Sequence, residues 1–507
     1  GARGITTRWA GVQQLAERLR EAPAASRVVV ALAADPGDTV RSAHETGEAQ
    51  AEELLRVFRA IAAAPEIPLW VVIRGMTGDR GGPESLAGCM AESLARVFAL
   101  EHPERWGGLI DVAVAAGFED LERACALLCA PQEAPRDSFF SVQGGVAFVP
   151  RLVPAVAPDA TTEKVILSRD GSYLVTGGLG AIGLHVAGWL AARGAGRIVL
   201  LGRREPSAGA QARLAEIGAS GCEIVTLQGD VAASEDVERL WPEVATHDRP
   251  LRGVLHAAGV FQATKLEDLD IATLVSVTRA KTVGGLLLHE RTRGIALDFF
   301  ALFSSISSVW GTRSLGAYAA GNRFLDGLAA LRRAQGLPAT SISWGPWGGQ
   351  GMSADEHERE LKGLGVLPVA PERALAALES CLAEDAPHTV VAHIDWGRFL
   401  PLMETVGQGV WLTTAAPGAD VRTPASGAPD RMQAWAALSG RRREAAIAAE
   451  LQSMVRAIMG GPQDVALDPE RGFFDMGFDS MMAVELRNRL QPGAGAQLPA
   501  TLAFDHP

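Results

Sequence analysis

The sequence predicts an α/β protein that consists of two doubly wound subdomains followed by a small helical bundle. Its 507 residues are enough for about three domains, and a hydrophobic fraction of 48% supplies more than one core. Short apolar runs rich in β-branched residues alternate with stretches of helical periodicity, which indicates parallel sheets covered by helices on both faces. The last part of the chain shows helical periodicity only.

The first subdomain is predicted over residues 1–157, where strands and helices alternate. We expect strands at 27–34, 68–75, 107–114 and 146–153, and helices at 51–64, 85–103 and 121–130. No glycine-rich turn follows the first strand, which continues into ADPGDTV. This half therefore has the layout of a nucleotide-binding fold without its phosphate loop, and its start is expected to be incomplete.

The second subdomain is predicted over residues 158–400 and repeats the same architecture. We expect strands at 172–178, 197–202, 222–231, 252–259, 299–305 and 339–346, and helices at 184–194 and 317–336. Residues 401–430 are rich in Ala, Pro, Gly, Ser and Thr, which is typical of a flexible linker. Residues 431–507 are expected to form a small unit with helices at 443–460 and 480–491.

Composition and charge exclude several classes of function. Lys and Arg number 47 against 59 Asp and Glu, so the net charge is −12, and without basic runs the chain is a poor partner for nucleic acid or anionic membranes. No apolar run approaches the ~18 residues of a membrane span, and the first residues lack a signal-peptide pattern. The five scattered cysteines form no zinc-ligand set and indicate reduced thiols in a cytoplasmic protein.

A dinucleotide-binding turn follows the first strand of the second subdomain. The motif G-x-G-x-x-G lies between a strand and a helix, where glycines let the pyrophosphate approach the backbone and the free N–H groups of the helix. This makes the subdomain Rossmann-like. The residues that we expect at this turn are Gly177, Gly178, Leu179, Gly180, Ile182 and Gly183.

Other strand ends add to the predicted cofactor site. Arg203 and Arg204 stand where an NAD site usually has a carboxylate, and guanidinium groups pair with a phosphate, so NADPH is favoured. Asp230 and Val231 close the third strand beside the expected adenine. The segment His256, Ala257, Ala258 and Gly259 is expected to line the cofactor, although the histidine itself is better explained as structural.

The motifs of the second subdomain, taken in order, resemble those of a known family. TGGLGAIG, LLGRR, GDV, LHAAG, RAK, LFSS, GAYAAGN and WGPW follow one another as in the ketoreductases of modular polyketide synthases, members of the short-chain dehydrogenase/reductase superfamily. The C-terminal GFDS resembles an acyl carrier protein. The resemblance implies reduction of a carrier-bound β-ketoacyl thioester by NADPH in the bacterial cytoplasm. Because no further domain separates the two subdomains at 158–164, an enoyl reductase is not expected there.

The chemistry of ketone reduction needs a proton donor and a group that polarises the carbonyl. The chain has only two tyrosines, and Tyr318 is the candidate proton donor. Lys281 is the candidate cation that would lower the pKa of this phenol, and Ser305 can donate a hydrogen bond to the substrate oxygen. Asn322 lies one helical turn after Tyr318 and can hold a water that relays protons. Simpler superfamily members have the lysine four residues after the tyrosine, where this chain has Asn322. The resemblance implies that the lysine and the asparagine have exchanged positions here.

The resemblance also suggests the stereochemical class. An LDD triplet is absent after HAAG, where Phe261 and Gln262 stand instead, and Trp310 lies eight residues before Tyr318. Both features are similar to A-type ketoreductases, which implies an L-hydroxyl, and we expect Trp310 to lie beside the substrate groove. Leu315 is not the histidine of epimerising enzymes, so no epimerisation is expected. Met352 lies in a segment, 351–365, that resembles the lid helix.

The C-terminal unit resembles a carrier with Ser480 as its 4′-phosphopantetheine attachment site, because D-x-G-x-D-S precedes an amphipathic helix. Its end is expected to be truncated, since carriers of this family continue into a final helix. The resemblance implies a phosphopantetheinyl transferase, a ketosynthase, an acyltransferase and, where present, a dehydratase as partners in a homodimeric megasynthase. Two alternatives stay open: a fatty-acid-synthase-like or iterative multienzyme, and a redox-inactive scaffold or epimerase.

Overall fold

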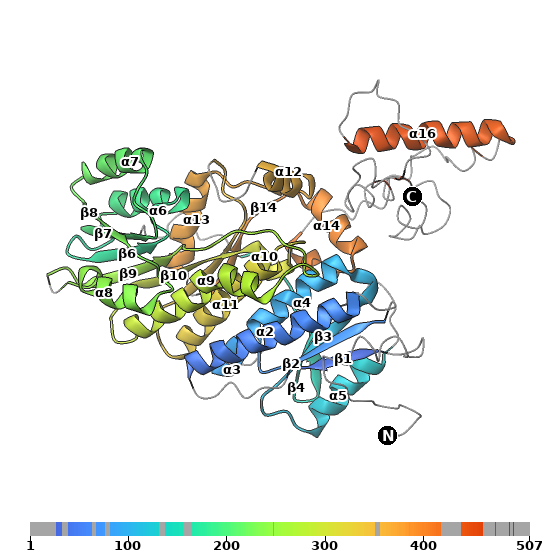
Figure 1. Cartoon of the computed structure of the whole chain (residues 1–507), viewed down its shortest axis with the longest axis horizontal. Helices are drawn as coiled ribbons and strands as arrows, with labels where there is room; N and C mark the ends of the chain where they lie inside the picture. Colours follow the sequence, from blue (N-terminus) through green and yellow to red (C-terminus); the bar gives the residue numbers. More distant parts are fainter. Residues whose placement is uncertain are drawn as a thin grey trace. The chain divides into compact units, whose positions relative to one another are not determined.

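The computed structural model describes residues 27–32, 39–62, 67–76, 82–130, 137–155, 165–246, 248–349, 355–384, 386–416, 435, 438–459, 472, 486 and 490. The chain divides into two units, residues 1–395 and 396–507. The first unit contains both of the predicted α/β subdomains (Figure 1).

The sheet of the first subdomain follows the order of the sequence, β1-β2-β3-β4-β5. Its strands are β1 (Val28–Ala31), β2 (Leu69–Arg74), β3 (Trp106–Val112), β4 (Phe139–Gln143) and β5 (Val146–Phe148). Its helices are α2 (Val40–Ala62), α3 (Pro83–Ala87), α4 (Cys89–Glu101) and α5 (Phe118–Cys129). Alternate residues of β2 face opposite ways: Leu69 and Val71 pack in the core with α2 and α4, whereas Trp70 packs in the core that includes Ala124 of α5. Helices therefore cover both faces, as expected.

One feature of this sheet differs from the prediction. The closing strand β5 pairs antiparallel with β4. The sequence analysis predicted β5 but not β4. Gly144 and Gly145 connect them with φ angles of 58° and 73°, the left-handed conformation that a two-residue hairpin turn requires. The sheet therefore ends in a hairpin, and a fully parallel sheet was a wrong prediction.

The second sheet is parallel and has the order β13-β11-β10-β9-β6-β7-β8. Its strands are β6 (Ser172–Thr176), β7 (Arg197–Gly202), β8 (Glu223–Gln228), β9 (Leu251–His256), β10 (Phe299–Ser305), β11 (Thr340–Trp344) and β13 (His388–Val391). Helices α6 (Ala181–Ala192), α7 (Ala208–Gly218), α8 (Ser234–Val244), α9 (Ile271–Thr292), α10 (Ile306–Trp310), α11 (Gly316–Ala334), α12 (Asp355–Gly363) and α13 (Pro371–Ala383) surround it (Figure 1). Strands β12 (Val366–Leu367) and β14 (His393–Ile394) form a separate antiparallel pair.

The strand order places one switch point in the second sheet. From β6 the chain adds β7 and β8 on one side, and then β9, β10, β11 and β13 on the other. In such sheets ligands bind at the carboxyl ends of the strands where the order reverses, here between β6 and β9. The first sheet has no such reversal among its described strands, which agrees with its lack of a phosphate loop.

Helices α9 and α11 of this unit are largely buried. Helix α11 packs against α9 and against α4 of the first subdomain, so it connects the two cores. In the described part of the chain, α9 is long and apolar enough to cross a membrane by length and composition, with 56% of its most apolar window buried inside the protein. Because it is mostly buried and packs on α11, α9 is explained as a core helix.

The second unit is described in part. It contains α14 (Trp396–Thr405), the 3₁₀ helix η2 (Val410–Ala415) and α16 (Arg441–Met459). Trp411 and Leu412 are buried, so the segment up to residue 416 is structured and the linker expected over 401–430 starts too early. Trp411 and Leu412 anchor the short helix η2. The Ala/Pro/Gly-rich composition of this region hid that helix from the sequence analysis. The carrier serine, Ser480, lies outside the described residues.

Candidate active site

The glycine turn lies at the switch point and brings β6 and β9 together. Gly177 has a φ of 69°, and a Cβ on it would lie 2.9 Å from the carbonyl oxygen of Ala257 and from the nitrogen of Ala258. A Cβ on Gly183 would lie 2.5 Å from the carbonyl oxygen of Gly177, so α6 begins directly against the turn. Gly180 precedes the first residue of α6. The turn and the free N–H groups of α6 fit the pyrophosphate of a dinucleotide.

Two arginines follow the next strand, β7. Arg203 and Arg204 are exposed, and among the described residues no hydrogen bond or ion pair engages either guanidinium group. Asp230, which follows β8, accepts a hydrogen bond from Ala232 N at 2.9 Å, and Val231 is buried. The arginines are thus available to an anion at the place where a 2′-phosphate is expected.

His256 ends β9 and is enclosed by the protein. Its side chain is fully buried, and Nδ1 lies 2.7 Å from Thr176 Oγ1. Burial, with the nearby charge of Lys281, lowers the pKa of His256 to about 3, so the ring is neutral. It joins the adjoining ends of β6 and β9, which fits the structural role favoured by the sequence, while the half-buried residues 257–259 continue toward the cavity.

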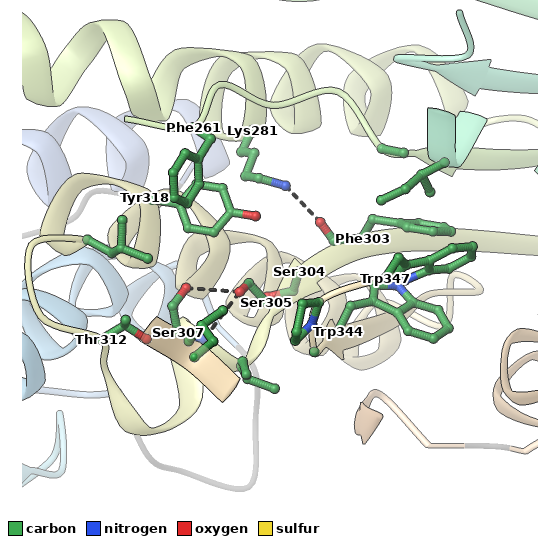
Figure 2. A pocket seen from close by; sticks show the side chains of 17 residues that line it. Phe261, Lys281, Phe303, Ser304, Ser305, Ser307, Thr312, Tyr318, Trp344 and Trp347 are labelled. Carbon is green, nitrogen blue, oxygen red and sulfur yellow. Dashed lines mark hydrogen bonds between the residues drawn. The ribbon is translucent and has the colours of Figure 1, made fainter. Parts of the chain in front are cut away.

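A cavity of about 120 Å³ lies beside these strand ends (Figure 2). It brings Ser305, Lys281 and Tyr318, which come from β10, α9 and α11, together with Ile182 of α6 and Ala257. The sequence analysis did not assign most of the aromatic wall, although the WGPW segment was noted. The lining residues that it missed are Phe303, Ser304, Ile306, Ser307, Thr312, Trp344, Gly345, Pro346, Trp347 and Leu361.

Ser305 sits where β10 turns into α10. Its Oγ accepts hydrogen bonds from Ser307 N at 3.2 Å and from the Ser307 hydroxyl at 3.1 Å, as Figure 2 shows. Because a hydroxyl has two lone pairs, both of which are used here, the remaining interaction of Ser305 is the donation of its own proton. The geometry therefore makes Ser305 a hydrogen-bond donor in the cavity.

Tyr318 lies in the first turn of α11 and is half-buried. Its ring packs edge-on against Phe261, with the ring centroids 5.5 Å apart. Asn322, one turn later, donates from Nδ2 to the carbonyl oxygen of Tyr318 at 2.7 Å, and its Oδ1 has no partner among the described residues. Asn322 is completely buried, so this oxygen is an acceptor to which a water or ligand can donate.

Lys281 is the buried cation of the site. It is 3% exposed, and its Nζ donates to the carbonyl oxygen of Phe303 at 2.7 Å (Figure 2). Burial lowers the pKa of Lys281 to about 8, against the opposing charge of Asp326. Its Nζ lies 6.0 Å from the centroid of the Tyr318 ring.

The electrostatics of Tyr318 differ from the sequence expectation. Burial raises the pKa of Tyr318, and the side chains of Asn322 and Ser305 oppose this only in part. Lys281 does not lower it, because the ammonium group is bonded to the main chain of β10 rather than to the phenol. The phenol consequently stays protonated at neutral pH.

The residues expected to control stereochemistry are dispersed. Leu315 and Phe261 line the cavity, whereas Gln262 is exposed. Trp310 is only 4% exposed and is not part of the cavity wall, so the structure does not place it beside the groove as we expected. It ends α10, a helix that packs against α4. Met352 lies outside the described residues, and α12 occupies part of the segment expected to form a lid helix.

Comparisons with known proteins agree with this geometry. Residues 171–349 match the family described as KR domain, and residues 449–507 match the phosphopantetheine attachment site. Erythronolide synthase EryA3 of Saccharopolyspora erythraea is 38% identical over 90% of this chain, and polyketide synthase GfsA of Streptomyces halstedii is 37% identical over 87%. The chain spans only 14% and 6% of these relatives.

Solved structures match over more of their length. One described as "Structure of A-type Ketoreductases from Modular Polyketide Synthase" is 33% identical with a TM-score of 0.72, covering 81% of this chain and 86% of that one. A C2-type ketoreductase from a modular polyketide synthase is 32% identical with a TM-score of 0.69, covering 79% and 87%. Ketoreductase domains use NADPH, and the attachment site carries 4′-phosphopantetheine. With Ser305, Tyr318 and Lys281 around one cavity and these matches on both sides of the linker, the chain belongs to the ketoreductases of modular polyketide synthases and is joined to an acyl carrier domain.

Proposed function

We propose that this chain reduces a carrier-bound β-ketoacyl thioester to a β-hydroxyacyl thioester with NADPH. One observation carries the proposal: Ser305, Tyr318 and Lys281 line the same cavity as Ile182 of α6 and Ala257, which follows β9. The Gly177–Gly183 turn fits the pyrophosphate, and the exposed Arg203 and Arg204 supply positive charge for a 2′-phosphate. NADPH supplies the hydride when bound.

The chain's own residues polarise the substrate carbonyl oxygen and supply the proton that it receives. Ser305 donates a hydrogen bond to the substrate carbonyl oxygen, where negative charge develops during the reaction, and keeps its own proton. Tyr318 then transfers its phenolic proton to that oxygen, and its raised pKa keeps the proton in place until it is needed. Asn322 Oδ1 holds a water that passes a replacement proton toward Tyr318. Lys281 fixes the Phe303 main chain and keeps positive charge within 6.0 Å of the ring.

The stereochemical proposal is an L-hydroxyl without epimerisation, as in A-type enzymes. Its support is the sequence pattern, in which Phe261 and Gln262 replace LDD and Leu315 stands three residues before Tyr318. The matched structures include both A-type and C2-type ketoreductases, so they do not discriminate between classes. Chiral analysis of the reduced thioester tests the proposal, and a D-hydroxyl would contradict it.

The carrier function is proposed for Ser480, which lies within the matched phosphopantetheine attachment site. A thioester on a long flexible arm makes delivery to the reductase intramolecular and raises its effective concentration. The proposed partners are a phosphopantetheinyl transferase and the ketosynthase and acyltransferase of a homodimeric synthase in the bacterial cytoplasm. The mass gain after incubation with coenzyme A and a phosphopantetheinyl transferase should disappear in Ser480→Ala.

The decisive experiment follows the absorbance of NADPH with a β-ketoacyl thioester as substrate. Tyr318→Phe should lower kcat by a factor of about 100 or more, because the proton donor is lost. The other tyrosine is the matched control: Tyr173 is fully buried, its hydroxyl oxygen accepts from Ser168 N at 2.8 Å, and it lies outside the cavity wall. Tyr173→Phe should keep kcat. An active Tyr318→Phe, or a wild-type chain that oxidises no NADPH, would contradict the proposal.

A further inference from the structure

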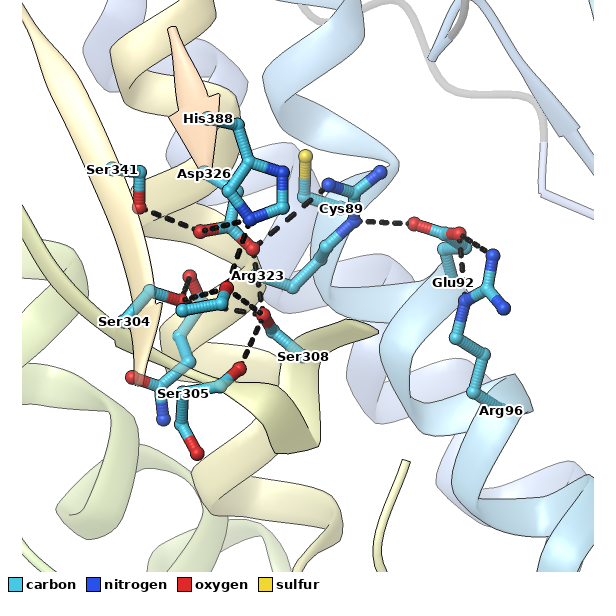
Figure 3. A network of polar contacts seen from close by, with 12 residues as sticks. Cys89, Glu92, Arg96, Ser304, Ser305, Ser308, Arg323, Asp326, Ser341 and His388 are labelled. Carbon is cyan, nitrogen blue, oxygen red and sulfur yellow. Dashed lines mark hydrogen bonds and ion pairs between the residues drawn. The ribbon is translucent and has the colours of Figure 1, made fainter. Parts of the chain in front are cut away.

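A buried carboxylate lies behind the active site and has no role in the chemistry described so far. Asp326 of α11 is 3% exposed. Its Oδ2 lies 2.7 Å from the hydroxyl of Ser308 on α10, and its Oδ1 lies 2.6 Å from the hydroxyl of Ser341 on β11 (Figure 3). One carboxylate thus connects three elements that surround the cavity.

The same cluster reaches the main chain of the active-site residues. The hydroxyl of Ser308 also lies 2.8 Å from the carbonyl oxygen of Ser305, so its single proton is shared between that oxygen and Asp326 Oδ2. The hydroxyl of Ser304 donates to the carbonyl oxygen of Asn322 at 3.1 Å and lies 3.3 Å from that of Ser308. These contacts tie the end of β10, which carries Ser305, to the helix that carries Tyr318.

The position of Asp326 along α11 reinforces this link. Tyr318, Asn322 and Asp326 are spaced four residues apart and therefore lie on one face of the helix. A displacement of Asp326 along this face would change the position of Tyr318 relative to Ser305. Since a misplacement of catalytic groups by about 1 Å can cost a factor of about 100 in rate, the contact is important for catalysis.

Two cations, Arg323 on α11 and Lys281 on α9, offset the buried charge, and His388 of β13 lies beside it. Arg323 Nη1 lies 3.9 Å from Asp326 Oδ2, and His388 Nε2 of β13 lies 3.6 Å from Oδ1. Arg323 also pairs with Glu92 of α4 at 2.5 Å, which joins the cluster to the first subdomain (Figure 3). On the cavity side, the negative charge of Asp326 raises the pKa of Lys281 against the effect of burial.

We propose that Asp326 is a positioning residue of the reductase, which holds the main chain of Ser305 in register with Tyr318 through Ser308. This inference rests on the proposed function. Asp326 does not line the cavity, so it acts through its neighbours. Its charge has a second effect, because it favours the protonated form of Lys281.

Two serine variants form the matched test, since both hydroxyls bond the same carboxylate and both side chains are at most 1% exposed. Ser308→Ala removes the link toward Ser305 and should lower kcat by a factor of about 10 or more, with KM changed by less than about twofold. Ser341→Ala removes the link toward β11 and should lower kcat by less than about threefold. Equal kcat values in these two variants would overturn the positioning role.

Asp326→Asn tests the charge. It should lower kcat and move the alkaline limb of the kcat–pH profile to lower pH, because Lys281 loses its proton more readily without the carboxylate. The charged or titratable groups facing Lys281 are Asp326 and Tyr318 on α11 and the neutral His256 on β9. Ser308→Ala keeps the carboxylate and should leave the alkaline limb in place.

The outcomes separate the two proposals. An active wild-type chain whose Asp326→Asn variant keeps both kcat and the alkaline limb overturns the positioning role alone. A wild-type chain without NADPH oxidation overturns both. If Asp326→Asn does not fold, as shown by circular dichroism and thermal melting, the comparison of Ser308→Ala with Ser341→Ala decides.

Discussion

Replacing Lys281 with methionine should remove activity without destabilising the protein. Burial lowers the pKa of Lys281 from its ordinary 10.5 to about 8. Each tenfold change in proton affinity corresponds to about 1.4 kcal/mol, so holding the charged lysine in the folded state costs about 3 kcal/mol. The variant loses the bond to Phe303 O, which contributes about 1.5–3 kcal/mol because its donor is charged. At pH 7 the free energy of unfolding should therefore be unchanged or higher by about 1 kcal/mol.

The dependence on pH gives the sharper measurement. Below pH 8 the lysine is protonated in both states and the folded protein bears the full cost. As the pH rises from about 8 to 10.5, the folded protein releases the proton first, so wild-type stability rises relative to Lys281→Met by about 3 kcal/mol. Urea unfolding of both proteins at several pH values measures this difference. A difference that does not change with pH, or a loss of more than about 2 kcal/mol at pH 7, would refute the reasoning.

Three further predictions concern the cofactor turn and the contact between subdomains. Gly183→Ala should abolish NADPH binding in a fluorescence titration, because its Cβ would lie 2.5 Å from Gly177 O; retained affinity would contradict this. Arg203→Ala should raise KM for NADPH by about tenfold and leave that for NADH, and equal effects on both would refute the 2′-phosphate assignment. Burial would raise the pKa of Glu92, but Arg323 and Arg96 outweigh it and lower the pKa to about 2. Glu92→Gln should therefore cost about 3 kcal/mol at neutral pH, a difference that should shrink between pH 4.5 and 2 in acid unfolding; a neutral variant would contradict it.

Motifs that act through local backbone geometry were predictable from the sequence. The glycine turn needs only a strand, three glycines and a helix in succession, and the structure shows it with Gly177 at a φ of 69°. Strands β6, β7, β9, β10 and β11 were recognised for a similar reason, since buried parallel strands are continuous apolar runs. In contrast, β13 was not assigned: it is a short strand whose four residues are all only half-buried.

The sequence predicted which residues form the candidate site, but not their hydrogen bonds or the direction of their pKa shifts. Ser305, Lys281 and Tyr318 were named from their motifs, and the cavity brings them together. Their bonding was not foreseen, because the partner of Lys281 is a main-chain carbonyl, and every residue has one. Trp310 was expected beside the groove, but it is buried at the end of α10, a helix that packs against α4 more than 200 residues earlier in the sequence.

The sequence by itself determined the order of the elements, the cofactor turn and the residues available for chemistry, because these depend on local patterns of a few residues. Only the tertiary structure decided how those residues are held. The protonated state of Tyr318, the neutral His256 and the cluster around Asp326 result from burial and from contacts between α4, α10, α11 and β11. Desolvation and long-range hydrogen bonds depend on which elements enclose a group, and no local pattern encodes that enclosure.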